Sequence, residues 1–510
     1  MGSEAERYLR VLQLTGSAAL HPWTIRGLMS HEVSKILPQG TDHPWENSVD
    51  FQFDPPGGLD IGWASPRVSF HSNSSYPFGE NDGGVWVGRG LTVLVEGGAF
   101  MRLGPLHLRV APQGFWAENA WFDLAENGHL EEGANWDYRQ PTEIDRPQRF
   151  GEKAYARLGL GSSMLQLALP QITLGVSGAG QQWGPALHYP LLLGNNAGGF
   201  AHVFGQTSTP VDLWAVRVHG RYIFGWPEQS DFSSTSTQDH HRIVTGIIVT
   251  LLPRGLPGLE LGAARFMHTL SMGDGFGVRD IFRVFSGVTN SFMSGENIFL
   301  ENQLASLFFR WAFPAAGIEI FGELIKDDFT RDLRHIIEEP DDMMGRVIGL
   351  QKVWSRDNGG LVVFRSEVVN SSVHHSERFD RLRRGGLPLP LYYNHGVRQG
   401  HTQLGQLLGS PTAYGGAGWT VGVDLYNNHG RWTADISRTL RTDFSAIHGG
   451  TNGPGINDVI YSLKMEAVRF REGVEWGITF SPSLNLNRNL IEKNDLFNMS
   501  IGLSVRGLPW

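Results

Sequence analysis

The sequence predicts an all-β transmembrane protein: one antiparallel outer-membrane β-barrel of about 18 strands, preceded by a small helical segment. Three observations predict this fold. The last two strands carry apolar residues on one face only, strands and turns alternate from about residue 59 onward, and the connections between strands are alternately short and long. Outer-membrane barrels combine these properties, with short periplasmic turns and long outer loops.

The final hairpin shows the pattern most clearly. Every even position of 474–481 is apolar, and so is every odd position of 497–505. Because successive side chains of a strand point to opposite faces, each strand has one apolar and one polar face. About ten residues is the length that a tilted strand needs to cross a bilayer. The chain also ends on an aromatic residue, Trp510. We therefore expect the apolar face of this hairpin to lie against lipid.

The composition of the chain agrees with a barrel and excludes several other classes. The mean hydropathy is -0.20, which a barrel with a polar lumen and polar loops also shows. No run of about 18 apolar residues occurs, which excludes helical membrane spans. The absence of cysteine excludes disulfides and thiolate metal sites. The net charge of -9 gives no reason to expect a nucleic-acid partner.

Residues 1–37 are expected to form an N-terminal periplasmic helical segment. Ser3 and Glu6 have the spacing of a capping box, and Gly16 suits a helix end. A second short helix is expected after Ser30. Residues 38–58, rich in Pro, Gly and Asp, read as a linker to a barrel that occupies 59–510. The first residues lack the features of a signal peptide, so we expect that a signal was removed or lies upstream.

The alternation of strands and turns gives the predicted order of the barrel. We expect strands of one direction near residues 59–70, 99–110, 171–180, 211–225, 258–270, 317–327, 360–370, 431–440 and 474–485, and of the other near 85–96, 154–168, 198–205, 242–252, 299–312, 343–354, 417–426, 459–470 and 496–506. Short turns such as Gly97-Gly98 all fall at one end, and long connections such as 111–153 and 371–416 at the other. The alternative is a soluble protein of several β-sandwiches, which gives no reason for loop length to segregate.

The connection after the fifth strand carries the most distinctive motif. It reads Gln181-Gln182-Trp183-Gly184-Pro185-Ala186-Leu187-His188-Tyr189-Pro190-Leu191-Leu192-Leu193-Gly194-Asn195-Asn196. This resembles a Trp-Gly-Pro, Leu-rich, Asn-Asn segment of the Wzi capsule-assembly family of outer-membrane barrels. Three further segments are similar to that family in the same order: Gly104-Pro105-Leu106 leading to Glu118-Asn119, Gly322-Glu323-Leu324 followed by Asp327-Asp328, and Gly400-His401-Thr402 through Leu408-Gly409. The family's frequent arginine after Asn-Asn-Ala is Gly198 here.

The resemblance implies a function as well as a fold. It implies an 18-stranded barrel with periplasmic helices that holds newly exported capsular polysaccharide at the cell surface, as a lectin that catalyses no reaction. We accordingly expect capsular or extracellular polysaccharide and outer-membrane lipids as partners. We expect a monomer, no nucleic-acid partner, no cofactor and no metal site.

Two outer loops offer candidate polysaccharide-binding residues. The 111–153 loop supplies aromatic side chains beside carboxylates, which suit the apolar faces and hydroxyl groups of sugars: Trp116, Trp121, Trp136 and Tyr138. The alternative is that these aromatics form the interfacial girdle and the loop core. The 371–416 loop supplies guanidinium groups that suit uronic-acid carboxylates or lipid phosphates: Arg378, Arg381, Arg383, Arg384 and Arg398. Its alternative is a solvated loop neutralised by the acidic 328–342 loop.

Two further groups are predicted inside or at the rim of the barrel. The apolar connection is expected to fold inward as a plug built from Trp183, Gly184, Pro185, Leu191, Leu192, Leu193, Asn195 and Asn196. Glu323, Asp327 and Asp328 stand at a strand end, where they are expected to pair with arginines across the lumen, or else to bind a divalent cation.

Three function classes remain open from the sequence. A surface carbohydrate-binding barrel is the leading hypothesis, and a porin or sugar-uptake channel shares the same architecture. A barrel hydrolase is the third, but no spacing singles out a pair of carboxylates for glycoside hydrolysis. The adjacent histidines of Asp239-His240-His241 and His374-His375 would point to opposite strand faces, which makes them poor metal sites.

Overall fold

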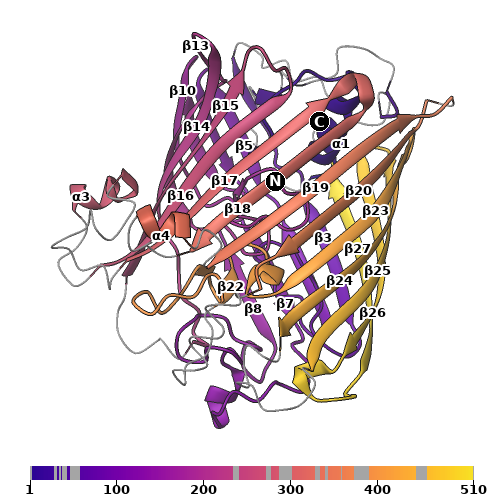
Figure 1. The fold of residues 1–510 in the computed structure, drawn as a ribbon. Coiled ribbons are helices and arrows are strands. Elements are labelled where there is room, and N and C mark those ends of the chain that lie inside the picture. The colour runs from indigo at the N-terminus through magenta and orange to yellow at the C-terminus, as the bar shows by residue number, and fades with distance from the viewer. Residues whose placement is uncertain are drawn as a thin grey trace.

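The strands pair edge to edge into one closed antiparallel barrel (Figure 1). The computed structural model describes residues 3–27, 32–33, 36, 43–45, 58–233, 241–271, 277–285, 301–327, 333–338, 343–357, 359–372, 390–443 and 456–508. Pairing of β27 with β3, from Ser500 opposite Asn73 to Arg506 opposite Arg67, closes the ring. The predicted fold class, an antiparallel barrel of the outer-membrane type, is confirmed.

The bounds of the elements follow the predicted order. The first half comprises α1 (Glu4–Thr15), β1 (Ile25–Arg26), β2 (Leu59–Trp63), β3 (Arg67–Asn73), β4 (Gly90–Glu96), β5 (Ala99–Leu103), β6 (Leu106–Val110), β7 (Gln113–Ala117), β8 (Tyr155–Gly159), β9 (Met164–Ala168), β10 (Ile172–Ser177), β11 (Gln182–Trp183), β12 (Ala201–Thr207), β13 (Val211–Leu213), β14 (Val216–Trp226) and β15 (His241–Pro253). The second half comprises β16 (Leu259–Ser271), α3 (Val278–Ile281), β17 (Glu301–Phe313), β18 (Ile318–Asp327), α4 (Leu333–Glu338), β19 (Met344–Ser355), β20 (Leu361–Asn370), β21 (Thr402–Gln403), β22 (Gln406–Leu407), β23 (Ala417–Asn427), β24 (Gly430–Asp443), β25 (Asn457–Arg471), β26 (Val474–Leu486) and β27 (Leu496–Gly507).

The first four passages of the chain along the barrel wall are each divided into two short strands, and the four breaks lie at about the same height of the wall. Strand β2 continues into β3, β4 into β5, β6 into β7 and β8 into β9. The two strands of each such pair follow each other along the wall, since both hydrogen-bond to strands of the same neighbouring pair. Glycine and proline stand at the breaks, and a Cβ at Gly98 would lie 1.8 Å from the carbonyl oxygen of Val110. The number of strands in the barrel depends on whether each divided passage counts as one strand or as two. The expected number of about 18 strands therefore stays a prediction.

This interruption corrects the predicted position of one turn. Gly97-Gly98 is not a hairpin turn, since β4 runs on into β5 there. The turn comes at Gly104-Pro105, where Leu103 faces Leu106. The expected single strand 99–110 is therefore two strands. The expected loop 111–153 begins with a strand, β7, because the chain returns along the wall before it leaves the barrel.

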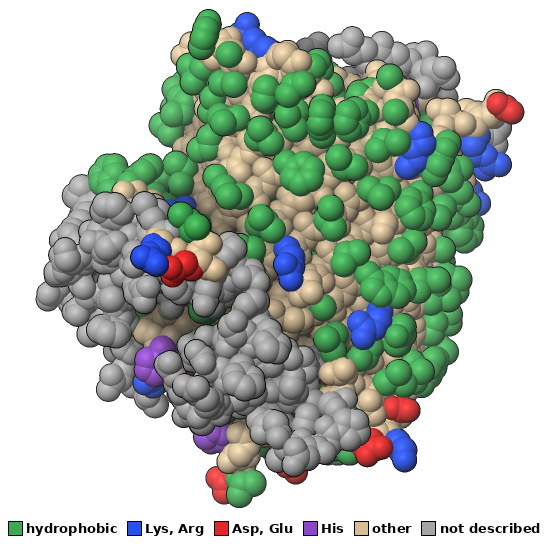
Figure 2. Space-filling view, in the orientation of Figure 1, with side chains coloured by type: hydrophobic (Ala, Val, Ile, Leu, Met, Phe, Trp, Pro, Cys, Tyr) green, Lys and Arg blue, Asp and Glu red, His purple; other side chains and the backbone are tan. Residues whose placement is uncertain are grey.

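The outer wall is apolar along its strands (Figure 2). In the final hairpin Trp476 and Ile478 face outward opposite Val505 and Leu503, while Asn498 between the outward residues of β27 is fully buried. Such an exposed apolar belt is unfavourable in water and fits the hydrocarbon of a bilayer. The predicted alternation of apolar and polar side chains in this hairpin is therefore confirmed, and its apolar face points outward.

Short turns and long connections lie at opposite ends of the barrel. The short turns include Gly104-Pro105 and the hairpin of β23 and β24, and α1 lies at the same end (Figure 1). We call this the turn end. Helices α3 and α4 and the hairpin of β21 and β22 belong to long connections, which lie at the other end, called here the loop end.

The N-terminal segment lies within the turn end of the barrel. Ser3 Oγ accepts the Glu6 N–H (3.1 Å), and Gly16 ends α1 with a left-handed φ of 76°. The expectation of helix throughout 3–37 is wrong in one place, because β1 pairs with β11 of the later connection. The second helix expected after Ser30 lies mostly outside the described residues. Within the described part of the chain, none of the helices has the length and apolar character needed to cross a bilayer.

Candidate functional site

Helix α1 closes the turn end of the lumen through buried ion pairs. The guanidinium of Arg10 donates to Glu319 Oε1 (2.9 Å). On the wall, Arg310 donates to the other oxygen of Glu319 (2.7 Å) and to Glu260. Arg310 also reaches Gln13 of the helix (3.1 Å). These side chains are all at most 2% exposed, so each charge has its partner inside the protein.

A second group of charges fixes the first turn of α1. Arg431 of β24 donates to both carboxylate oxygens of Glu4 (2.8 and 2.9 Å) and to Glu466 (2.7 Å). Arg7 donates to both oxygens of Asp424 (2.7 and 2.8 Å). Tyr8, on the same helix, stacks on Trp45, whose ring centroid lies 4.1 Å away. Residue 45 of the predicted linker is thus part of the packed end.

The apolar connection that the sequence singled out lies inside the barrel. Trp183 is fully buried, and 191–193 are at most 2% exposed. These side chains pack in one core with wall residues such as Phe266 and Leu304. Pro185 and Asn195 lie in the same segment, which crosses the lumen between the two ends: the carbonyl oxygen of Pro185 accepts from Arg10, and Asn195 bonds the backbone of Asn81 (2.7 Å). We call 181–196 the plug.

Wall carboxylates hold the backbone of the plug. Glu367 accepts the N–H groups of Leu187 (2.8 Å), His188 (3.1 Å) and Tyr189 (2.6 Å). Glu323 accepts the N–H of Leu191 (3.4 Å), and a Cβ at Gly184 (φ 91°) would lie 2.7 Å from its Oε2 atom. Hydrogen bonds from several N–H groups stabilise a carboxylate much as an arginine does.

This arrangement corrects the expected partner of one rim carboxylate, Glu323. Glu323 and Asp327 were expected to pair with arginines across the lumen. Glu323 accepts the backbone N–H of Leu191 instead. Asp327 accepts the N–H of Tyr392. Asp328 lies outside the described residues.

A second connection, 390–416, interlocks with the plug. Tyr392 OH donates to the carbonyl oxygen of Leu191 (2.6 Å), and His401 Nε2 donates to that of Leu192 (2.6 Å). Burial lowers the pKa of His401 to about 3, against the hydrogen bond to Leu192 that raises it. The ring is therefore neutral at pH 7, and its Nδ1 accepts from His268 Nε2 (2.8 Å). The two connections together fill the middle of the lumen.

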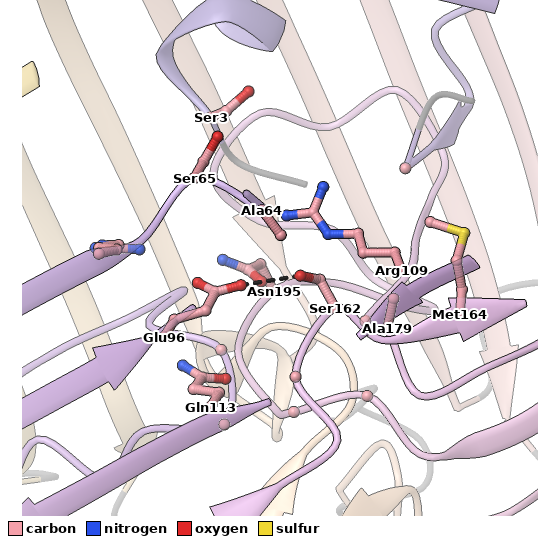
Figure 3. A pocket seen from close by; sticks show the side chains of 18 of the residues that line it. Ser3, Ala64, Ser65, Glu96, Arg109, Gln113, Ser162, Met164, Ala179 and Asn195 are labelled. Carbon is pink, nitrogen blue, oxygen red and sulfur yellow. Dashed lines mark hydrogen bonds between the residues drawn. The ribbon is translucent and has the colours of Figure 1, made fainter. Parts of the chain in front are cut away.

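A cavity of about 590 Å³ remains between the plug and the interrupted part of the wall (Figure 3). In Figure 3, Glu96 accepts from Ser162 (3.0 Å), and the guanidinium of Arg109 points into the same space. Arginines outnumber carboxylates around it: the charged residues of its lining are Glu6, Arg26, Arg67, Asp82, Glu96, Arg102, Arg109, Arg157, Arg221, Glu475 and Arg506. The cavity thus has both charged and apolar groups in its lining and lies beside the plug.

The loop end presents an aromatic ring beside two guanidinium groups. The Arg146 and Arg441 guanidinium carbons each lie 5.8 Å from the centroid of the Tyr138 ring. Arg146 also pairs with Asp137 and lies 4.7 Å from the Tyr414 ring. Tyr138 is partly exposed, and so are both arginines. Aromatic faces can stack on the apolar faces of sugars, and guanidinium groups can bind carboxylates bidentately.

The other candidate residues of the outer loops that the structure describes have surroundings of their own. Trp116 lies in β7 on the outward face of the wall, so the girdle interpretation fits it better. Trp121 is 63% exposed and its carbonyl accepts from Arg89. Trp136 packs against His129 (ring centroids 5.0 Å apart), and Arg398 is exposed. Arg378, Arg381, Arg383 and Arg384 lie outside the described residues.

A buried carboxylate ties two outer connections together. Asp145 accepts both the N–H (2.8 Å) and the hydroxyl of Ser230, and also the N–H of Gly405 (3.1 Å). Burial raises the pKa of Asp145 to about 6, although the hydrogen bonds from Ser230 lower it. We therefore expect the protonation of Asp145, and with it the hydrogen bonds between these connections, to change at mildly acidic pH.

Comparison with known proteins identifies the fold. No protein-family model matches the chain, and no curated protein matches its sequence. Among solved structures, the chain is similar to Wzi of Escherichia coli, described as an outer membrane protein involved in group 1 capsule assembly and as a carbohydrate-binding β-barrel, with a TM-score of 0.62 and 13% identity over 98% of both chains. The chain has the fold of Wzi.

Two porins are more distant. A BenF-like porin from Pseudomonas fluorescens shares 9% identity, with a TM-score of 0.42 over 88% of this chain and 98% of that one. OccK9 of Pseudomonas aeruginosa shares 11% identity, with a TM-score of 0.40 over the same shares of the two chains. The resemblance that the sequence motifs indicated is confirmed at the level of the fold by the similarity to Wzi.

Several residues that fill the lumen had no signal in the sequence. Glu367 and Arg431 each sit in an otherwise ordinary strand, and each bonds a segment more than 170 residues away: the plug for Glu367 and α1 for Arg431. A charged residue at a lumen-facing position of a strand was the only available sign. Such positions are common in barrels, so this sign does not distinguish a plug ligand from a residue that faces water.

Proposed function

We propose that this chain is an outer-membrane barrel that binds capsular or other extracellular polysaccharide at the cell surface and catalyses no reaction. In this proposal the turn end faces the periplasm, the loop end faces the exterior, and the barrel acts as a monomer in the lipid. The observation that carries the proposal is the pair of guanidinium groups around the partly exposed ring of Tyr138 at the loop end.

The chemistry of this surface favours an acidic polymer. A uronic acid offers an apolar ring face to Tyr138 and a carboxylate to Arg441, whose own partner Asp458 lies at 3.1 Å. Wzi, which has the same fold, is itself described as carbohydrate-binding. Capsular polymers rich in uronic acids are therefore the ligands we expect.

The filled lumen supports a surface role over transport. Helix α1 occupies the turn end, and the plug and the 390–416 connection pack across the middle. A porin or sugar-uptake channel, the alternative predicted from the sequence, needs a continuous aqueous path. The side chains of α1, the plug and the 390–416 connection occupy the lumen where such a path would run, beside the remaining cavity.

The direct test is binding of the organism's own surface polysaccharide to the purified barrel in detergent. We expect Tyr138→Ala and Arg441→Ala to weaken retention of the polymer at least several-fold. Trp116→Ala, on the outward wall, is the matched control and should bind as the native protein does.

A second variant tests the other basic loop. An Arg381, Arg383 and Arg384 to Ala variant should weaken binding further if that loop contributes. Unchanged retention in this variant would remove the loop from the proposal. Whatever the triple variant shows, unchanged retention of the polymer by both the Tyr138→Ala and the Arg441→Ala variants would overturn the proposed binding surface.

A further inference from the structure

Two histidines and one glutamate meet at the turn end of the lumen, away from the proposed carbohydrate surface. His21 follows α1, Glu32 lies further along the N-terminal segment, and His219 belongs to β14 of the wall. One ligand atom from each residue lies within 4.8 Å of the others. All three residues are buried, at 7%, 2% and 1% exposure respectively. Three potential metal ligands, two from the N-terminal segment and one from the wall, thus converge on one point.

The distances in this cluster suit a metal ion better than hydrogen bonds. Glu32 Oε1 lies 3.5 Å from His21 Nε2 and 3.4 Å from His219 Nε2. Neither Nε2 atom has a hydrogen-bond partner, and a strong charge-assisted N–H···O contact would be about 2.7–2.9 Å long. Ligand atoms that lie about 2.0–2.1 Å from a tetrahedral zinc ion are about 3.4 Å apart. The spacing of Oε1 from both imidazoles is therefore that of a tetrahedral site.

Neighbouring groups orient these ligands. His219 Nδ1 lies 2.7 Å from Thr207 Oγ1, which also accepts the N–H of Gly220 (3.1 Å). An Nδ1–H that donates to this hydroxyl leaves the Nε2 lone pair free for a metal, the arrangement usual for ligating histidines. The second oxygen of Glu32 accepts from Gln206 (3.3 Å).

Arg221, a cation near the cluster, does not occupy the place of the ion. Arg221 lies two residues after His219 on β14, and its guanidinium donates to Gln206 Oε1 (2.8 Å). Arg221 therefore reaches the carboxylate of Glu32 through the Gln206 amide. The other oxygen of Glu32, Oε1, lies 3.5 and 3.4 Å from the two imidazole Nε2 atoms.

We propose that His21, Glu32 and His219 bind one divalent transition-metal ion, for which Zn²⁺ has the matching ligand preference. A water molecule would complete the four-coordinate shell. Because the ligands come from the N-terminal segment and from the wall, the ion ties that segment to β14. This metal site is independent of carbohydrate binding at the loop end, and the sequence did not predict it.

Metal titration of the purified full chain tests the proposal. The protein carries no histidine tag, is stripped with a chelator in detergent and is then titrated with ZnCl₂. We expect one Zn²⁺ per chain by elemental analysis and calorimetry. Co²⁺ in its place should give the visible absorption of a tetrahedral site. Zn²⁺ should also slow proteolysis of the N-terminal segment.

Three variants separate a metal site from a buried ion pair. Glu32→Gln keeps the shape of the side chain but removes a charged ligand, so it should lower Zn²⁺ affinity by more than about 100-fold. Thr207→Val removes the hydroxyl that orients His219 and should lower Zn²⁺ affinity about 10–100-fold. His71→Asn, on β3 outside the cluster, should bind like the native protein. Absence of stoichiometric Zn²⁺ in the native chain would overturn the proposal, and so would native affinity in Glu32→Gln.

Discussion

The two fillings of the lumen are built from different interactions. At the turn end, α1 is held by side-chain ion pairs such as Arg10 with Glu319. In the middle, the plug is held by apolar packing around Trp183 and by backbone N–H groups that converge on Glu367. An ion pair is lost when either charged side chain is replaced. Contacts made by backbone N–H groups are lost only when the connection follows a different course through the lumen. The turn end should therefore be sensitive to single charges, and the plug to changes of shape.

The largest effect is expected from Arg310→Ala. The change leaves Glu260 and Glu319 buried without their shared cation, which should cost about 5 kcal/mol in the free energy of unfolding. Unfolding by guanidinium chloride in detergent, followed by tryptophan fluorescence, measures this loss. The matched control is Arg334→Ala, which removes an exposed ion pair with Glu338 and should cost less than about 1 kcal/mol. Equal losses in the two variants would show that the buried network does not hold the turn end.

Trp183→Ala tests the apolar part of the plug. Removing a fully buried indole from the packed lumen should cost about 4 kcal/mol. Trp476→Ala, on the lipid-facing wall, should cost much less in the same unfolding experiment, because its side chain is half exposed. If the two variants were equally stable, Trp183 would not anchor the plug.

A pH-dependent contribution is expected from Asp145. Its raised pKa means that the folded state binds the proton more tightly than the unfolded state does. The contribution to stability is thus fully present below about pH 4 and is lost as the pH rises through about 6. It amounts to at most about 3 kcal/mol.

The measurement compares native protein with Asp145→Asn between pH 4 and 7.5. The difference in their free energies of unfolding should change across this range, and the exposed Glu492→Gln variant should follow the native curve. A constant difference between native protein and Asp145→Asn would contradict the assignment.

The smallest effect is expected from Glu367→Gln. The amide retains one acceptor oxygen but no charge for the N–H groups of Leu187, His188 and Tyr189, which should cost about 2 kcal/mol. Limited proteolysis should show cleavage of the plug in this variant before the barrel itself unfolds. Cleavage at the native rate would mean that other contacts suffice to hold the plug.

The wall was predictable because its pattern is local. Alternation along 474–481 and 497–505 depends only on the two-residue period of a strand, and the cap of α1 depends on Ser3 and Gly16. The misplaced turn at Gly97-Gly98 has a local cause too. Glycine pairs mark both turns and kinks, and the pairing of β4 with β7 decides between them here.

The contents of the lumen were predictable only in part. The apolar character of 183–196 indicated that this segment folds inward, since apolar loop residues are unfavourable in water. Its partners were not predictable, because Glu367 and Tyr392 reach it from distant parts of the chain. The cluster of His21, Glu32 and His219 likewise has no sequence spacing that indicates a metal site.

Single-channel recording in planar bilayers tests most directly whether the lumen is filled. We predict that native protein inserts without stable large currents, because α1 and the plug occupy both the turn end and the middle of the barrel. Stable large single-channel currents from the native chain would contradict the account and favour a transport function.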